Sequence, residues 1–288
     1  MTDQSVCTEA GELISTAVSK LTAVGIELPQ LEARILLGSV MQIPPSQFIV
    51  SPEIKCSDEE KLKYIALVER RKQYEPVSHL TGFREFWSLN YQITSSVLDP
   101  RPDSETLVFE ALKSFPERKL PLRVLDIGVG SGCLLLSFLS ERPNAVGIGV
   151  DISLSALKIA YQNAVSFELS NRAVFQQSNW LDGVAGEYDV IFCNPPYVSS
   201  EEFKLLHDDV RKFEPREALL AGVDGLEAYK NILPHISKFL SKDGEAFFEV
   251  GINQAQRVSE ISEANGLIVR GQFADISGIP RCLAIKKH

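Results

Sequence analysis

The fold is decided by the stretch Leu122-Arg123-Val124-Leu125-Asp126-Ile127-Gly128-Val129-Gly130-Ser131-Gly132. It joins a short apolar run, typical of a buried strand, to three glycines spaced two residues apart. Glycine permits unusual backbone torsions and lets a ligand approach the main chain closely. The stretch is therefore predicted to form a strand, a ligand-binding turn and the start of a helix. A tight strand-to-helix turn without a ligand is the alternative.

Strands and helices alternate on both sides of this stretch. Such alternation predicts an α/β fold, with an open, mostly parallel sheet and helices on both faces. Two last strands, near 267–273 and 281–286, should complete the sheet as an antiparallel edge. The other predicted strands cover 122–126, 145–151, 173–176, 189–193 and 246–250, and the predicted helices cover about 104–115, 132–141, 154–168 and 225–240.

The first 75 residues or so are predicted to form a small helical domain, because their apolar residues recur at steps of three and four. Ser57-Asp58-Glu59-Glu60 is a capping box that should open the third helix. Such a domain could be a lid, a partner-docking module or a cap on the core. The apolar stripes are Leu13, Ala17, Leu21 and Val24 in the first helix, Ala33, Leu36, Leu37, Val40 and Met41 in the second, and Leu62, Ile65 and Ala66 in the third.

A β-hairpin is predicted between the helical domain and the α/β region. From Trp87 to Ile93 apolar and polar residues alternate, which indicates a half-buried strand, and Leu80-Thr81-Gly82-Phe83 precedes it. Asp99-Pro100-Arg101-Pro102-Asp103 should then be rigid and extended, with Ser104 placed to cap the next helix. The predicted domains are a helical domain at 1–75, a hairpin linker at 76–99 and an α/β domain at 100–288.

Composition and charge exclude several classes of protein. Of the 288 residues, 44% are hydrophobic and 23% are charged, which is ordinary for a globular protein. The net charge of −9 argues against general nucleic-acid binding, because that affinity comes largely from Lys and Arg.

We expect no signal peptide at Met1-Thr2-Asp3-Gln4 and no membrane span. The five scattered cysteines favour buried thiols in a reducing cytoplasm, and neither they nor the four histidines suggest a metal site.

Asp151 ends the strand that follows the glycine loop. An acidic side chain there can accept hydrogen bonds from both hydroxyls of a ribose, in NAD enzymes and methyltransferases alike. It could instead cap the helix that begins at Leu154, although Ser153 could serve as that cap. The glycine spacing separates the two ligand classes, since a dinucleotide fingerprint needs Gly or Ala where this chain has Cys133. G-x-G-x-G, with Asp126 two places before it, resembles the S-adenosylmethionine loop of class I methyltransferases instead.

The most specific signal is Asn194-Pro195-Pro196-Tyr197, which directly follows the predicted strand at 189–193. The two prolines fix a rigid loop and leave the carbonyl of Pro195 free, and Asn194 supplies a second acceptor through its side-chain oxygen. Two fixed acceptors can hold both N–H groups of a planar amine or amide and stabilise the positive charge that develops as a methyl group arrives. Tyr197 can stack on the planar group. Catalysis would then come from orientation and electrostatics, without a strong base. An ordinary turn with a packed tyrosine is the alternative.

These motifs together resemble the peptide chain release factor glutamine methyltransferases (the PrmC/HemK family). The tetrapeptide marks methyltransferases that modify nitrogen conjugated to a planar system, and the resemblance covers nearly the whole chain. Besides the helical domain, the glycine loop and the tetrapeptide, it rests on Leu80-Thr81-Gly82-Phe83-Arg84-Glu85-Phe86-Trp87-Ser88-Leu89, Pro100-Arg101-Pro102-Asp103-Ser104-Glu105, Phe213-Glu214-Pro215-Arg216-Glu217-Ala218-Leu219 and Asp275-Ile276-Ser277-Gly278-Ile279-Pro280-Arg281.

The resemblance implies a fold, a reaction and a partner. The fold would be the class I, Rossmann-like methyltransferase fold behind a small N-terminal helical domain. The reaction would move a methyl group from S-adenosylmethionine to the side-chain amide nitrogen of the glutamine in the Gly-Gly-Gln motif of class I peptide chain release factors. No nucleic-acid substrate and no membrane would be involved. Two alternatives remain, namely an N-methyltransferase of exocyclic amines on nucleic-acid bases and a non-catalytic ligand-binding module.

The resemblance also implies roles for single residues. Around the donor, Asn179 stands where the family often has Asp, and its amide oxygen could still bind the adenine amino group. Near the substrate, Asp99 stands where an apolar residue is common. The donor site would comprise Asp126, Gly128, Val129, Gly130, Ser131, Gly132, Asp151 at the ribose, Asn179 and Trp180 at the adenine, and Asn194. The substrate site would comprise Asn194, Pro195, Pro196 and Tyr197, with Asn194, Pro195 and Tyr197 as the catalytic residues, Arg101 and Glu105 at the entrance, and Glu214 bracing the loop.

Overall fold

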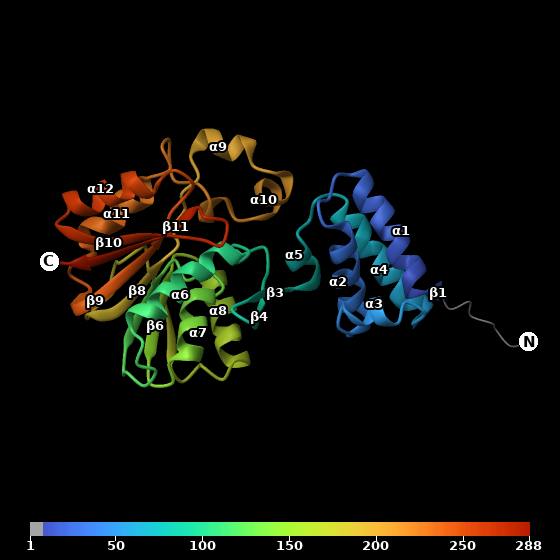
Figure 1. Ribbon diagram of the computed structural model, residues 1–288, viewed down its shortest axis with the longest axis horizontal. Helices are drawn as coiled ribbons and strands as arrows, with labels where there is room; N and C mark the ends of the chain where they lie inside the picture. The colour runs from blue at the N-terminus through green and yellow to red at the C-terminus, as the bar shows by residue number, and fades with distance from the viewer. Residues whose placement is uncertain (1–7) are drawn as a thin grey trace, which may run out of the picture. The chain divides into compact units, whose positions relative to one another are not determined.

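The computed structural model describes residues 8–288, and the chain forms two compact units (Figure 1). The first unit comprises the N-terminal part up to Gly82 together with Asp208–Phe213. The second comprises Phe83–His207 and Glu214–His288. None of the helices in the described part of the chain is long and apolar enough to cross a membrane. The division into a helical domain at 1–75, a hairpin linker at 76–99 and an α/β domain at 100–288 stays a prediction.

The first unit contains the helices that its periodicity predicts. Helix α1 ends just before Gly25, whose φ of 79° is a left-handed value that favours glycine. The predicted capping box is present, with the hydroxyl of Ser57 accepting from the amide of Glu60 and the carboxylate of Glu60 accepting from the amide of Ser57. The unit consists of β1 (Thr8–Glu9), α1 (Ala10–Ala23), α2 (Pro29–Met41), α3 (Gln47–Val50), β2 (Lys55–Cys56), α4 (Asp58–Arg71), α5 (Val77–Thr81) and, later in the chain, α10 (Asp208–Phe213).

The predicted buried stripe of α4 is wrong. Leu62 is 69% exposed and Ile65 is 37% exposed, whereas Tyr64 and Val68 are buried in the core of the unit. The hydroxyl of Tyr64 donates to the carbonyl oxygen of Ala33 in α2, at 3.2 Å. Both faces of α4 carry apolar residues at helical spacing, so the sequence of the helix alone does not choose between them. Packing against α1 and α2 makes that choice.

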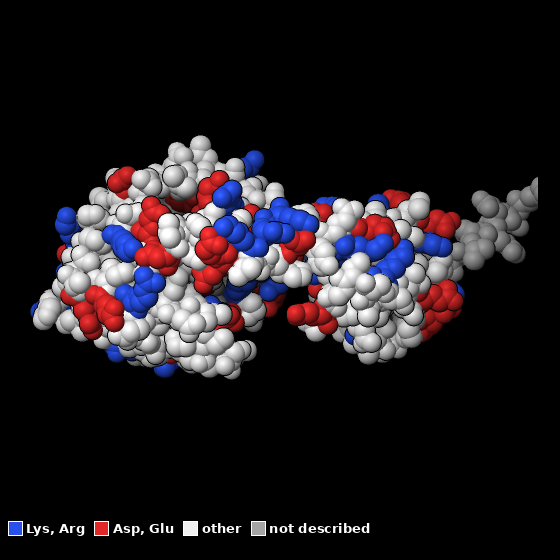
Figure 2. Space-filling model, turned by 90° about the horizontal axis from the view of Figure 1, so that it is seen from above, with Lys and Arg blue, Asp and Glu red and all other residues white. Residues whose placement is uncertain are grey.

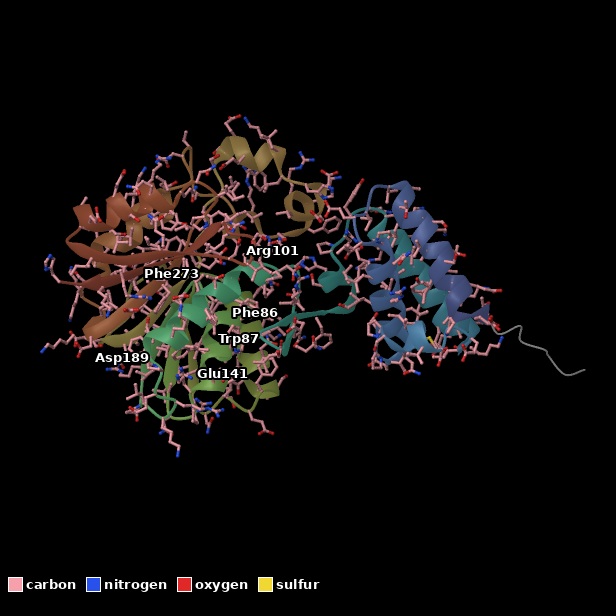
Figure 3. The ribbon with its side chains drawn as sticks, in the orientation of Figure 1. Phe86, Trp87, Arg101, Glu141, Asp189 and Phe273 are labelled. Atoms are coloured by element: carbon pink, nitrogen blue, oxygen red, sulfur yellow. The ribbon has the colours of Figure 1, made fainter. Side chains whose placement is uncertain are left out.

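The hairpin exists, but its turn lies where the sequence predicts a strand. Strands β3 (Phe83–Phe86) and β4 (Leu89–Gln92) pair antiparallel, and Trp87 and Ser88 form the turn with φ values of 53° and 60°. These residues lack the usual Asn-Gly signature of such a turn. Carboxylates of Glu105 and Glu85 accept from their backbone amides, at 2.8 and 2.7 Å, and thereby stabilise it. The indole of Trp87 also donates to Glu141 at the end of α7, at 3.3 Å, and both residues are labelled in Figure 3.

The larger sheet confirms the predicted α/β fold. Its strand order is β10-β11-β9-β8-β5-β6-β7, with β9 to β7 parallel and β10 and β11 forming an antiparallel edge. From β5 the chain continues to β6 and β7 on one side, and it then crosses to β8 and β9 on the other. The strands are β5 (Arg123–Ile127), β6 (Val146–Asp151), β7 (Ala173–Gln177), β8 (Tyr188–Cys193), β9 (Leu240–Glu249), β10 (Leu267–Ala274) and β11 (Pro280–Lys287).

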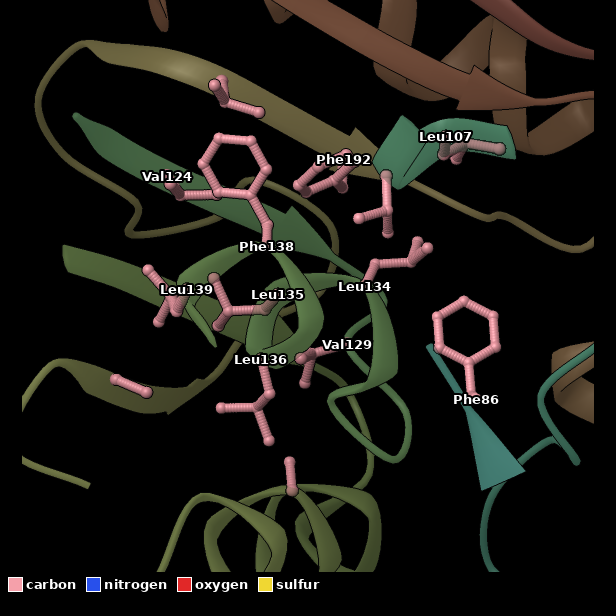
Figure 4. Close-up of a cluster of buried hydrophobic side chains, with 14 of the residues drawn as sticks. Phe86, Leu107, Val124, Val129, Leu134, Leu135, Leu136, Phe138, Leu139 and Phe192 are labelled. Carbon is pink, nitrogen blue, oxygen red and sulfur yellow. The ribbon is translucent and has the colours of Figure 1, made fainter. Parts of the chain in front are cut away.

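The helices cover both faces of this sheet. On one face, Phe138 of α7 packs edge-to-face on Phe192 of β8, with ring centroids 5.6 Å apart (Figure 4). The side chains of β5 alternate between the two cores, since Val124 belongs to this one and Leu125 to the other. The first face carries α6 (Glu105–Ser114), α7 (Cys133–Glu141) and α8 (Leu154–Ser166), and the second carries α11 (Glu227–Ile236) and α12 (Ala255–Ala264).

Two helices of this unit are not predicted from the sequence. Helix α9 (Ser200–Leu205) is short, and its residues are not buried. Helix α12 buries Ala255, Val258, Ser259 and Ser262, a face that includes two serines. The cysteines Cys56, Cys193 and Cys282 are buried as expected, whereas Cys133 is only partly buried. Cys7 and the expectation for residues 1–4 lie outside the described residues.

Candidate active site

The strand order places a topological switch point at the carboxyl ends of β5 and β8. In open α/β sheets, ligands bind where the chain leaves neighbouring strands in opposite directions. Here that point lies between β5 and β8. In Figure 3, Asp189 near the amino end of β8 lies far from Arg101, which is one of the residues predicted at the entrance of the site. The glycine loop and the tetrapeptide therefore follow adjacent strands and meet at one edge of the sheet.

The glycine loop has the backbone conformation that its sequence predicts. Gly128, Gly130 and Gly132 have φ values of 76°, 53° and 86°, in the left-handed region. The amides of Gly128 and Val129 both donate to the carbonyl oxygen of Val150 in β6, at 2.8 and 2.9 Å. A Cβ built on Gly130 would come no closer than 4.0 Å to a described atom outside its immediate neighbours. The loop is thus fixed on its inner side and open on its outer side.

Asp126 lies beneath this loop and is 1% exposed. One carboxylate oxygen accepts from the amide of Leu135 at 3.2 Å, and the other has no hydrogen-bond partner among the described residues. Burial raises the pKa of Asp126 to about 7, and the negative charge of Asp151 adds to this rise. A buried carboxylate oxygen without a partner fits the cationic amino group of S-adenosylmethionine. The neighbouring Ser131 is buried, and its carbonyl oxygen accepts from the side chain of Asn163.

Asp151 connects the end of β6 to the glycine loop. One carboxylate oxygen accepts from the amide of Gly130 at 3.0 Å, and the other accepts from the amide of Ser153 at 2.9 Å. The N-cap of α8 is Ser153, whose hydroxyl accepts from the amide of Ala156. Asp151 is therefore not the helix cap. Each carboxylate oxygen has a second lone pair, so the side chain can still accept hydrogen bonds from a ribose.

Asn179 and Trp180 follow β7, close to Asp151. The amide of Ser178 donates to the carbonyl oxygen of Asp151 at 3.0 Å, and the hydroxyl of Ser178 donates to the carbonyl oxygens of Trp180 and Asp182. Trp180 has a φ of 51°, and its side chain packs partly against the core that contains α11. Asn179 is exposed. The turn that carries both residues therefore begins beside the end of β6.

Hydrogen bonds to Glu249 and Gln254 fix the last residue of the tetrapeptide, Tyr197. The hydroxyl of Tyr197 donates to a carboxylate oxygen of Glu249 at 3.2 Å, and its carbonyl oxygen accepts from the side chain of Gln254 at 2.9 Å. Burial raises the pKa of Tyr197, and the negative charge of Glu249 adds to this rise. A Cβ on Gly225 would lie 2.5 Å from the carbonyl oxygen of Tyr197, so only glycine fits there. Pro195 is buried, whereas Asn194, Pro196 and Tyr197 are partly exposed.

Arg101 and Glu214 form an ion pair although 113 residues separate them. The guanidinium of Arg101 also lies 3.7 Å from the carboxylate of Asp99. Burial raises the pKa of Glu214, and the positive charge of Arg101 opposes that rise. The segment that follows Glu214 pairs with the residue directly after the tetrapeptide, because the amide of Val198 donates to the carbonyl oxygen of Leu219 at 2.9 Å. Arg101, the residue predicted at the entrance, is thus ion-paired with Glu214, the residue predicted to brace the loop.

Glu105, the other predicted entrance residue, accepts from the backbone amide of Trp87 in the hairpin turn. Its role at the entrance stays a prediction. Ser104 precedes α6 as expected, but its side chain makes no cap hydrogen bond, so that prediction is wrong. The hydroxyl donates to Glu249 instead, a residue that the sequence interpretation missed. The signal for Glu249 was an acidic residue near the end of an apolar strand, as with Asp126 and Asp151.

Comparison with known proteins agrees with these features. Two family models match, the PrmC N-terminal domain over residues 12–82 and the methyltransferase small domain over residues 102–212. The release factor glutamine methyltransferase of Rhodospirillum rubrum is 36% identical over 278 residues, which cover 96% of this chain and 85% of that protein. The one of Caulobacter vibrioides is 38% identical over 264 residues, which cover 91% of each chain.

A solved methyltransferase from Pyrococcus furiosus shares the fold, with a TM-score of 0.52 and 17% identity, over 75% of this chain and 97% of that one. The class I methyltransferase fold and the family that the motifs predict are both confirmed. The members of this class use S-adenosylmethionine as the methyl donor. The chain belongs to the release factor glutamine methyltransferase family.

Proposed function

We propose that this protein methylates the side-chain amide nitrogen of the glutamine in the Gly-Gly-Gln motif of class I peptide chain release factors. One observation carries the proposal. In a chain that belongs to this family, Asn194 and Pro195 follow β8 directly, beside the strand that ends in the glycine loop. Two acceptors for a planar amide would therefore lie next to the methyl donor. We place the reaction in the cytoplasm, where its substrate works.

The residues around the glycine loop fit S-adenosylmethionine. The unpartnered oxygen of Asp126 would accept from the donor's amino group, and the open side of Gly130 leaves room for the ligand. Asp151 would accept from the ribose hydroxyls, and Asn179 and Trp180, which follow β7 beside it, would line the adenine. Val129 fixes the loop against β6. When bound, S-adenosylmethionine supplies an electrophilic methyl group.

The chemical difficulty lies in the acceptor. The lone pair of an amide nitrogen is delocalised into its carbonyl group, which makes the nitrogen a poor nucleophile. The side-chain oxygen of Asn194 and the carbonyl oxygen of Pro195 would accept its two N–H groups and hold the lone pair toward the methyl group. They would also stabilise the positive charge that develops on nitrogen. A proton then leaves the nitrogen for water, so a strong base is not required.

Tyr197 would lie against the planar face of the substrate amide, and Pro196 would line the same side. The hydrogen bond of Tyr197 to Glu249 fixes the position of its ring. Arg101, held by Glu214 and Asp99, would shape the entrance together with Glu105. A tripeptide motif offers little surface for selectivity, so we further propose that residues 1–75 bind the body of the release factor.

Methylation of exocyclic amines on nucleic-acid bases is the competing activity. The net charge of −9 disfavours it, because nucleic-acid affinity depends on phosphate neutralisation. On the face of the larger unit shown in Figure 2, Asp and Glu are interspersed with Lys and Arg. On that face the acidic side chains oppose the attraction of Lys and Arg for a phosphate backbone. We therefore propose that nucleic acid is not a direct substrate.

One experiment separates these activities. The full-length protein is incubated with methyl-labelled S-adenosylmethionine and, in parallel, with a release factor, duplex DNA or ribosomal RNA. Mass spectrometry then locates the label. A methyl group on the glutamine of Gly-Gly-Gln supports the proposal, whereas label only in nucleic acid contradicts it. Tight donor binding without label in any acceptor would favour a binding module.

A further inference from the structure

The hydroxyl of Ser104 makes an unexpected hydrogen bond. Ser104 immediately precedes α6, yet its Oγ donates to a carboxylate oxygen of Glu249 at 2.5 Å. The two residues are 145 positions apart in sequence and are only 2% and 1% exposed. A serine hydroxyl carries one hydrogen. That hydrogen is committed to Glu249, so the Ser104 oxygen can act toward any other neighbour only as an acceptor.

Glu249 is the last residue of β9, the strand next to β8. Its second carboxylate oxygen accepts from the hydroxyl of Tyr197 at 3.2 Å, and its carbonyl oxygen accepts from the hydroxyl of Tyr229 at 2.8 Å. Burial raises the pKa of Glu249, while the hydrogen bonds from Ser104 and Tyr197 and the charge of Arg281 oppose that rise. A carboxylate only accepts hydrogen bonds, so the hydroxyls of Ser104 and Tyr197 both donate their hydrogens to Glu249.

The other neighbour of the Ser104 hydroxyl is Asn194. Its Nδ2 lies 3.5 Å from Oγ, a length common for active-site hydrogen bonds before the substrate is bound. Since the hydroxyl oxygen can only accept, the NH₂ end of the amide faces it and Oδ1 faces the other way. The two ends of an Asn amide are nearly identical in size and shape, so hydrogen bonding rather than packing must choose its orientation.

We propose that Ser104 and Glu249 are positioning residues that fix the amide of Asn194 with its oxygen toward the substrate. The inference rests on the proposed function, in which that oxygen accepts an N–H of the glutamine amide. With the amide turned over, Asn194 would present N–H groups to an N–H donor, and the site would lose one of its two acceptors. Neither residue needs to touch the substrate.

The first test is Ser104→Ala in the full-length protein, assayed with a release factor and labelled donor. We expect kcat to fall about tenfold, because one orienting hydrogen bond of ordinary strength is removed. The Kd of the donor and the KM of the release factor should stay within about twofold of wild type, since Ser104 is only 2% exposed and the inference assigns it no contact with either. An unchanged kcat overturns the inference, and so does a loss confined to KM or to donor affinity.

A double-mutant cycle then asks whether Ser104 acts through Asn194. We expect Ser104→Ala to cause no further loss in a protein that already carries Asn194→Ala, because no amide remains to be oriented. An equal loss in both backgrounds would show that Ser104 acts elsewhere and would overturn the inference. Labelled methyl groups make the low residual turnover measurable.

Three further variants control for general damage to the fold. Ser262 is also a fully buried serine, but its hydroxyl donates to Val258 within α12, and Ser262→Ala should keep the wild-type kcat. Glu249→Gln keeps an oxygen that can accept from Ser104 and should retain activity within about threefold, whereas Glu249→Leu should lose more than Ser104→Ala, because it also removes the hydrogen bond from Tyr197. Equal kcat for the two Glu249 variants contradicts the inference. If the wild-type protein does not methylate a release factor, the proposed function itself fails.

Discussion

Asp151 accepts a hydrogen bond from the backbone amide of Gly130 at 3.0 Å, which ties the end of β6 to the tip of the glycine loop. The same carboxylate accepts from the amide of Ser153. One side chain therefore shapes the loop and, in the proposed function, holds the ribose. This double role makes Asp151 the most informative residue for testing donor binding.

Asp151→Ala should weaken donor binding by about 10–100-fold, because it removes the hydrogen bonds of a charged acceptor. Titration calorimetry with S-adenosylmethionine measures the change. Ser153→Ala is the matched control, since it removes only the cap of α8 and should cost about 1 kcal/mol of stability without changing donor affinity. Unchanged affinity in folded Asp151→Ala would remove Asp151 from the site.

Asn194→Ala should lower turnover by about 10²–10³-fold while donor binding largely survives, since one preorganised acceptor for the substrate amide is lost. Rates with labelled donor and calorimetry on the same preparation separate the two effects. Turnover close to that of wild type would mean that the tetrapeptide is only a turn.

Gly130→Ala should weaken donor binding by more than its effect on stability explains. The φ of 53° costs alanine about 1 kcal/mol, and the added methyl group points into the space assigned to the donor. Gly266→Ala is the control, because Gly266 has a φ of 73° and no described neighbour within 4 Å of a built Cβ. Thermal unfolding should show similar losses for both variants, whereas calorimetry should show weaker donor binding only for Gly130→Ala. Equal donor affinities would contradict the assigned ligand position.

Donor binding should release a proton near neutral pH. Burial raises the pKa of Asp126 to about 7, and a bound ammonium group beside the carboxylate would lower it again. Donor affinity should therefore rise as the pH increases to about 7 and then level off. Calorimetry in two buffers of different ionisation enthalpy measures the released proton, which Asp126→Asn should abolish. The same proton release in that variant would assign it to another group.

Asp126 should also affect stability in a defined pH window. Because its pKa is higher in the folded protein than its ordinary value of 3.8, its contribution to the free energy of unfolding is greatest below about pH 4. That contribution is lost as the pH rises through about 7. The difference in the free energy of unfolding between wild type and Asp126→Asn, followed by urea denaturation, should show this slope. A difference independent of pH would argue against the raised pKa.

Removal of residues 1–75 should reduce methylation of a release factor more than it reduces donor binding, because the residues proposed to bind the donor all lie in the second unit. Circular dichroism must first show that the shortened protein is folded. Equal losses of methylation and donor binding would favour a domain that only caps the core.

The sequence by itself determined the alternation of strands and helices in the larger sheet, but not α9, α12 or the turn at Trp87 and Ser88, and it determined which residues follow the strands of the parallel sheet. The glycine spacing, Asp151 and the tetrapeptide are local patterns, and in a parallel sheet the carboxyl ends of neighbouring strands meet at one edge. The candidate site could therefore be predicted before its geometry was known. The class I fold and the family follow from the same patterns and are confirmed.

Only the tertiary structure decided which partners these residues meet. Helix α4 has two apolar stripes, and packing against α1 and α2 selected the one with Tyr64 rather than the one with Leu62. Ser104 has the position of a helix cap, but β9 brings Glu249 to it from 145 residues away. Such pairings depend on strand order and on the crossings between strands, and local sequence contains neither. The sequence therefore identifies the hydrogen-bond acceptors of the candidate site, whereas their orientation depends on the tertiary structure.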